Sequence, residues 1–246
     1  MLFGTATVFV SLLLPSLGFA LPRPQIADDA LATFAKRATP VESLAAGFAE
    51  IEASKTEVSI AAVESVRNDL IDGGCDDIIV IFARGTSGEG NVGAATSVGP
   101  IFFGNLSAVE PGKVIVQGVN DYPADVWGYL GGGSDDGAQY MAEMVRLASA
   151  QCPNSKVVLS GFSQGAQVTH KAGALIPSSL YSKVAAIVLF GDPNNGDAFP
   201  GALNNNVKTF CHDGDYICDG LPIITDQHGN YANDAPAAAA YVAARV

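Results

Sequence analysis

Residues 161–167 read GFSQGAQ and place Ser163 between two glycines. The serine follows the apolar run KVVLS and precedes a stretch of helical pattern that begins at Gln164. A Gly-x-Ser-x-Gly segment in this setting predicts a strained strand-to-helix turn that exposes the serine hydroxyl. A neutral serine is a poor nucleophile, so acyl-transfer chemistry at this turn also needs a histidine base and an acid that orients it.

The sequence contains three histidines that could serve as this base. In the predicted architecture the partners follow in the order serine, then aspartate or glutamate, then histidine. His170 falls in the same predicted helix as Ser163 and points elsewhere, and His212 precedes nearly all the candidate acids. His228, in TDQHGNY, follows them in a loop before the last predicted helix. His228 is therefore the predicted base.

The best candidate for the acid is Asp215 in CHDGDYIC, between Cys211 and Cys218 and just past the last predicted strand. A small disulfide ring there would fix the carboxylate against the histidine, which holds the imidazole in one tautomer. On local sequence alone, the competing carboxylates are Asp192, Asp213, Asp219 and Asp226.

The oxyanion formed during attack needs two hydrogen-bond donors. The backbone N–H of Gln164, next after the serine, is the predicted first donor. The second is expected from Thr86 in the glycine-rich loop FARGTSGEGNVG, residues 82–93. Taken alone this loop could bind phosphate, but it lacks the Lys-Ser/Thr ending, and its glycines do not have the dinucleotide-binding spacing.

Short apolar runs alternate with helical patterns along the chain. The predicted strands are residues 77–83, 113–119, 156–162, 183–191 and 206–210. The predicted helices are residues 91–107, 136–150, 164–176 and 234–246. Continuous apolar strands imply a sheet covered on both faces. The pattern predicts an α/β fold with a mostly parallel five-stranded sheet flanked by helices.

The chain has 246 residues and a formal net charge of −12, which disfavours nucleic acids and anionic lipids as partners. Residues 1–20 have the apolar centre and small-residue end of a secretory signal peptide. The alternative of a membrane anchor is disfavoured because Pro15 and Gly18 interrupt a short run. We therefore expect a secreted, extracellular protein without stable membrane insertion.

Two further segments are expected before the main domain at 67–246. Residues 21–37 end in the dibasic pair Lys36-Arg37 and resemble a propeptide, although the pair could also lie by chance on a surface helix. Residues 38–66 are predicted to form a helical extension that begins with a capping box at Thr39. A second amphipathic stretch continues through Val66 to Leu70.

Four cysteines in an exported chain suggest two disulfides. Three pairings are possible; Cys211 and Cys218 could close a short loop, and Cys75 and Cys152 would then close a long one. A metal site is the weaker alternative, because no CxxC pair is present. We expect neither a metal nor a cofactor.

Several of these motifs together resemble the cutinase family of secreted serine esterases. They are DDIIVIFARGTSGEGNVG, GFSQGAQ, VLFGDP, CHDGDYICDG and QHGNY, spread over residues 67–246 in the family's order. The resemblance implies a small α/β-hydrolase without a lid, and disulfides between Cys75 and Cys152 and between Cys211 and Cys218. It implies the same catalytic and oxyanion residues as above: Ser163, Asp215, His228, Thr86 and Gln164.

The resemblance also places two loops beside the catalytic centre, residues 119–133 and 219–227. The substrate-binding side chains expected there are Tyr122, Trp127, Leu221, Ile223 and Ile224. Apolar side chains around a serine suit an aliphatic polyester or a short-to-medium acyl ester as the substrate. We expect the enzyme to act as a monomer. Two alternatives stay open: an acetylxylan esterase of the same superfamily, which GDPNNG and HGNY also resemble, and a non-catalytic secreted effector.

Overall fold

The structure is a computed structural model and describes residues 64–246. The predicted signal peptide, the propeptide and all but the last three residues of the extension 38–66 lie outside the described residues. Residues 64–77 contain no helix, so the helical prediction around Val66 and Leu70 is wrong for this part. Leu70 is buried, but it lies in a turn, and Asn68 forms an antiparallel bridge with Gln117.

The centre of this part of the chain is a five-stranded sheet in which all neighbours pair in parallel, in the order β2-β1-β3-β4-β5. The strands are β1 (Ile78–Ala83), β2 (Val114–Gly118), β3 (Lys156–Phe162), β4 (Val184–Phe190) and β5 (Val207–Phe210). Each agrees with a predicted apolar run to within one residue, and the predicted fold class is confirmed.

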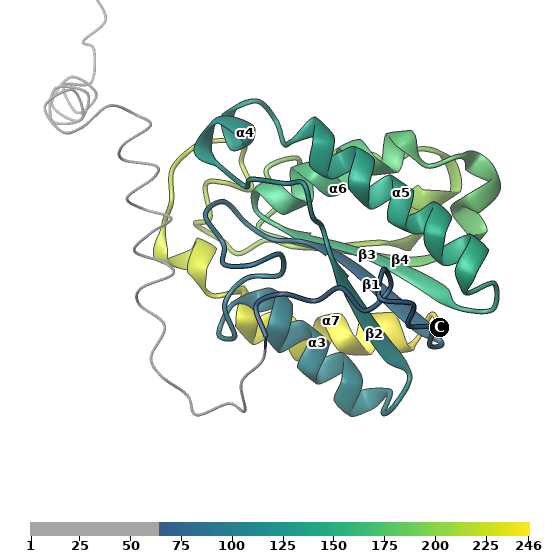
Figure 1. The fold of residues 1–246 in the computed structure, drawn as a ribbon. Coiled ribbons are helices and arrows are strands. Elements are labelled where there is room, and N and C mark those ends of the chain that lie inside the picture. Colours follow the sequence, from purple (N-terminus) through teal and green to yellow (C-terminus); the bar gives the residue numbers. More distant parts are fainter. Residues whose placement is uncertain (1–63) are drawn as a thin grey trace, which may run out of the picture. The chain divides into compact units, whose positions relative to one another are not determined.

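Helices cover both faces of the sheet (Figure 1). On one face lie α5 (Asp135–Gln151) and α6 (Gln164–Leu175), and on the other lie α3 (Val98–Val109) and α7 (Ala235–Ala243). The first of these helices on the chain, α3, starts seven residues later than predicted. Gly93, inside the predicted helix, has φ +91°, a left-handed conformation that suits glycine and interrupts a helix.

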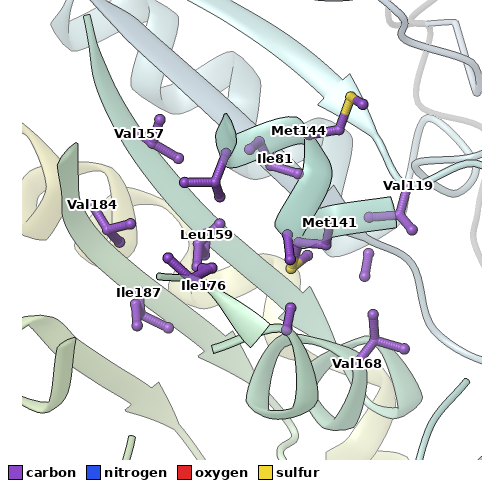
Figure 2. Close-up of a cluster of buried hydrophobic side chains, with 14 of the residues drawn as sticks. Ile81, Val119, Met141, Met144, Val157, Leu159, Val168, Ile176, Val184 and Ile187 are labelled. Carbon is purple, nitrogen blue, oxygen red and sulfur yellow. The ribbon is translucent and has the colours of Figure 1, made fainter. Parts of the chain in front are cut away.

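Alternate residues of each strand belong to different cores, because successive side chains point to opposite faces. On the α5 and α6 side, Ile81, Leu159 and Ile187 of three neighbouring strands share one cluster with Met141 and Val168 (Figure 2). The other core, under α3 and α7, contains the intervening strand residues Val80, Phe82, Val158, Val188 and Phe190. Burial on both faces explains why the strands are apolar without alternation.

Two disulfides join the four cysteines in the predicted pairs, Cys75 with Cys152 and Cys211 with Cys218. The first lies at the amino-terminal edge of the sheet and closes a loop with a sequence separation of 77. The second closes a loop with a separation of 7, after the carboxyl end of β5. On the chain-entropy model they stabilise the fold by about 4–5 and about 2–3 kcal/mol. Within residues 64–246, no helix has the length and apolarity that a bilayer crossing requires.

Candidate active site

The order of the strands in the sheet indicates where the candidate site lies. The chain runs from β1 outward to β2 and then returns to β3 on the other side of β1. In an open parallel sheet, ligands bind at the carboxyl ends of the strands beside such a reversal. The loop that carries Thr86 follows β1, and Ser163 follows β3, so the two neighbouring strands deliver both residues to the same edge.

Ser163 forms the tight turn that the sequence predicts. It joins β3 directly to α6 with φ 56° and ψ −120°, a strained conformation for a non-glycine residue. A Cβ on Gly161 would lie 2.2 Å from the carbonyl oxygen of Gly165. A Cβ on Gly165 would lie 2.0 Å from the carbonyl oxygen of Ala83. Both glycines are therefore required for the close approach of strand and helix.

The predicted acid and base meet in the interior. Nδ1 of His228 lies 2.8 Å from Oδ2 of Asp215, and both side chains are fully buried. The other carboxylate oxygen of Asp215 accepts the Ile217 N–H at 3.1 Å. Burial by itself raises the pKa of Asp215, but the hydrogen bonds from His228, Tyr231 and Ile217, with the nearby imidazole charge, lower it overall. Asp215 is thus held as a carboxylate against the imidazole.

The His228 ring lies beside the serine turn. It stacks on Phe162, the residue before Ser163, with the ring centroids 5.0 Å apart. It also packs so closely on Gly191 that a Cβ there would be 2.7 Å from the ring. The turn forms as predicted, but the prediction that it exposes the serine hydroxyl is wrong: Ser163 is buried, and its Oγ has no hydrogen-bond partner within the described part of the chain. Catalytic hydrogen bonds often form fully only with substrate bound.

The two predicted oxyanion residues are in direct contact. Nε2 of Gln164 donates to Oγ1 of Thr86 at 2.8 Å and to the carbonyl oxygen of Asp125 at 2.7 Å. Ser87 N–H donates to Ala124 O at 2.7 Å, which also ties the Thr86 loop to the segment before α4 (Val126–Leu130). The sequence indicated the backbone of Gln164 but not this role of its side chain.

The competing histidines each contact another acid. His170 on α6 contacts Asp192 at 2.9 Å and stacks on Phe199, so it contacts other residues than Ser163, in line with the prediction that it points elsewhere. His212 contacts Asp234 at 2.6 Å. The three remaining candidate acids are exposed: Asp213, Asp219 and Asp226.

The expected substrate-binding residues differ in exposure. Trp127 is 69% exposed, and Leu221 and Ile223 are also exposed. Ile224 is half-buried and packs with Val126, Tyr129 and Ile217, which joins α4 to the second loop.

Tyr122 differs from the prediction, because it is buried and not on the substrate surface. Its hydroxyl donates to Arg84 O at 3.0 Å, and its ring lies under the Arg84 guanidinium. It therefore packs the fold between the Thr86 loop and the loop at 119–133.

Among residues 64–246, no group of three or more His, Cys, Asp or Glu side chains is arranged to hold a metal ion. All-parallel strands in this order, helices on both faces and a strained serine between β3 and α6 define an α/β-hydrolase.

Comparison with known proteins identifies the family. The family profile described as Cutinase matches residues 74–246, and the chain belongs to the cutinase family. It is 39% identical over 243 residues to a cutinase of Trichoderma harzianum, covering 94% of each chain. It is 45% identical over 172 residues to a cutinase of Coprinopsis cinerea, covering 70% of this chain and 85% of the relative.

A solved structure agrees with this assignment. The Trichoderma reesei cutinase in complex with a phosphonate inhibitor is 36% identical, with a TM-score of 0.71 over 89% of this chain and 97% of that one. An acetylxylan esterase structure shares the fold alone, at 22% identity and a TM-score of 0.55 over 70% of this chain and 99% of that one. The chain is a carboxylic ester hydrolase of the serine esterase type, and the acetylxylan esterase alternative is not favoured.

Proposed function

We propose that Ser163, His228 and Asp215 form the catalytic triad of this esterase. The observation that carries the proposal is the buried hydrogen bond from His228 to Asp215, located beside the strained turn at Ser163. In the first half-reaction Ser163 Oγ attacks the ester carbonyl carbon while His228 takes the hydroxyl proton. The C–O bond to the leaving alcohol then breaks, and His228 gives the proton to the departing oxygen.

The second half-reaction uses water in place of the serine. His228 takes a proton from the water, the hydroxide adds to the acyl carbon, and the ester to Ser163 breaks as its oxygen regains the proton. In both halves the charge on the former carbonyl oxygen is stabilised by the backbone N–H of Gln164 and by Thr86. The contact between Gln164 Nε2 and Thr86 Oγ1 supports this role, because it fixes the two donors relative to each other.

We propose that the substrates are cutin-like polyesters and short-to-medium acyl esters. Trp127 on α4, with Leu221 and Ile223 on the opposing loop, presents apolar surface on the segments that flank the site. Such a surface favours docking on an insoluble aliphatic polymer. The cutinases among the relatives support the same substrate class.

We further propose that the enzyme acts outside the cell as a monomer. Two disulfides support secretion, because they persist in oxidising compartments and are rare in the cytosol. The acidic net charge of −12 does not attract nucleic acid or anionic lipid.

The triad is tested with para-nitrophenyl butyrate and the variant Ser163→Ala. We expect the wild type to turn over with a burst of the first product, and the variant to lose at least about 10⁴-fold in kcat. Undiminished turnover by Ser163→Ala would refute the proposed nucleophile.

The surface is tested by comparing a soluble ester with a polyester film. Trp127→Ala should leave hydrolysis of para-nitrophenyl butyrate within about twofold and lower film hydrolysis several-fold, through lost adsorption. Leu175→Ala is the matched control, because Leu175 is 46% exposed but ends α6 at the far end from Ser163. Equal film hydrolysis by all three proteins would contradict a docking role for this surface.

A further inference from the structure

We propose that Tyr231 is a positioning residue that holds the acid of the triad in place through its hydroxyl group. The proposal rests on the assignment of Asp215 and His228 made above. Tyr231 lies three residues after His228, in the 3-10 turn η4 (Tyr231–Asp234) that follows η3 (Asp226–Gly229).

The Tyr231 hydroxyl binds the same carboxylate oxygen as the catalytic histidine. It donates to Oδ2 of Asp215 at 2.6 Å, and Nδ1 of His228 lies 2.8 Å from that oxygen. The phenol oxygen in turn accepts the backbone N–H of His212 at 3.0 Å. A phenol has one proton, so acceptance from His212 leaves that proton directed at the carboxylate.

The ring that carries this hydroxyl is fixed on its other side. Tyr231 is buried, and the imidazole of His212 stacks on it with ring centroids 4.2 Å apart. His212 is itself held by Asp234 at 2.6 Å and by the carbonyl oxygen of Gln227, 3.2 Å from its Nδ1. The second histidine–aspartate pair of this region therefore orients Tyr231, which orients Asp215.

The charges of the two groups favour this arrangement. Burial and the neighbouring carboxylate raise the pKa of Tyr231 well above its usual range, which favours the protonated phenol. The hydrogen bond from Tyr231 is among the contacts that lower the pKa of Asp215. Without the hydroxyl, the buried carboxylate would have one donor fewer and would be more basic and less fixed.

Loss of the Tyr231 hydroxyl should affect one step of catalysis, the proton transfer by His228. Nδ1 of His228 would then be held by a carboxylate with one fixed donor fewer. A less fixed Asp215 also orients the imidazole less well during proton transfer. Substrate contacts are not altered, so the change should fall on kcat rather than KM.

The test is Tyr231→Phe in the full chain, assayed with para-nitrophenyl butyrate across pH. We expect kcat to fall about tenfold, equivalent to about 1.4 kcal/mol, with KM within about twofold of the wild type. The control is Tyr140→Phe, which removes a hydroxyl bonded to Asn120 at 2.9 Å, from a residue of α5 that takes no part in the site, and should change none of these values.

A double-mutant cycle separates positioning from general stability. In an Asp215→Ala background the hydroxyl has no carboxylate to hold, so adding Tyr231→Phe should cost no further activity. An equal loss in both backgrounds would overturn the proposal, as would a Tyr231→Phe enzyme with the kcat of the wild type.

A measurement on the wild type needs no variant to fold. Two protons donated to one carboxylate oxygen lie close together, so we expect a nuclear Overhauser effect between the Tyr231 hydroxyl and the His228 Nδ1–H at low temperature. Two assigned resonances without this effect would count against the proposal. An inactive wild type, or an active Ser163→Ala enzyme, would instead refute the triad itself.

Discussion

Replacement of Gly165 by alanine tests whether the serine turn depends on close backbone packing. The added Cβ would lie 2.0 Å from the carbonyl oxygen of Ala83 and 2.7 Å from that of Arg84. Ordinary contact begins at 3.4 Å, so the start of α6 must move away from the end of β1 by about 1.4 Å. Both obstructing atoms are backbone, so no side chain can rotate to relieve the clash.

This displacement affects stability and activity to different extents. Overpacking of this kind costs about 1–3 kcal/mol, which for a domain of this size lowers Tm by about 3–10 °C. Gly165 is the second residue after Ser163, and Ala83 lies just before the Thr86 loop. The same movement therefore separates the proposed nucleophile from one of the proposed oxyanion donors. A misplacement near 1 Å costs about 10²-fold in rate, so we expect kcat to fall by about that factor.

The assay compares kcat on para-nitrophenyl butyrate and Tm for Gly165→Ala and for Gly104→Ala. Gly104 also lies within a helix, α3, but a Cβ there would meet nothing within 4 Å. Its replacement should leave kcat unchanged and raise stability slightly, by about 0.5–1 kcal/mol. If Gly165→Ala matched Gly104→Ala in both kcat and Tm, the reasoning from backbone contact would be refuted.

Two further predictions concern the disulfides and the acid. Removal of the ring around Asp215 with Cys211→Ser and Cys218→Ser should lower kcat at least about tenfold. Removal of Cys75–Cys152 should cost more stability, about 4–5 kcal/mol, but leave kcat intact below the melting range, because that bond lies at the opposite edge of the sheet. Thermal melts and initial rates check both disulfide variants, and an unchanged kcat after loss of the Cys211–Cys218 ring would contradict the prediction for that ring. The pKa of Asp215 is lowered in the folded state. Its carboxylate therefore stabilises the fold at pH values above its pKa in the unfolded chain, about 3.9, and this contribution is lost as the pH falls through its lower pKa in the folded state. The Tm of the wild type should thus exceed that of Asp215→Asn most near pH 6 and by a shrinking margin below about pH 4; a margin constant with pH would disprove this.

The sheet could be predicted from the sequence because both of its faces are buried. The central strands β1, β3 and β4 are buried along most of their length and largely apolar, which separates them from the amphipathic helices between strands. Shorter elements gave no such pattern. The five residues of α4 are too few for helical periodicity, and the start of α3 depends on the left-handed turn at Gly93.

Tyr122 shows where the resemblance to a family does not place a single side chain. The resemblance placed its loop beside the catalytic centre and suggested a substrate contact, but the side chain is buried and its hydroxyl binds a backbone carbonyl. The partner, Arg84, is 38 residues away in sequence. No local pattern around Tyr122 reveals that contact.

The residues proposed to react could be predicted from the sequence pattern, whereas those proposed to hold them depend on single long-range contacts. The order of Ser163, Asp215 and His228 follows from which strand ends share an edge of the sheet, so chain order and strand pattern were enough to suggest them. Tyr231 and the side chain of Gln164 act through single hydrogen bonds to Asp215 and Thr86. A chain with the same strands and helices could contain the tyrosine of HGNY without forming the hydrogen bond between its hydroxyl and Asp215. The proposed positioning of Asp215 therefore depends on packing between η4 and the Cys211–Cys218 ring, and it is tested at the hydroxyl of Tyr231.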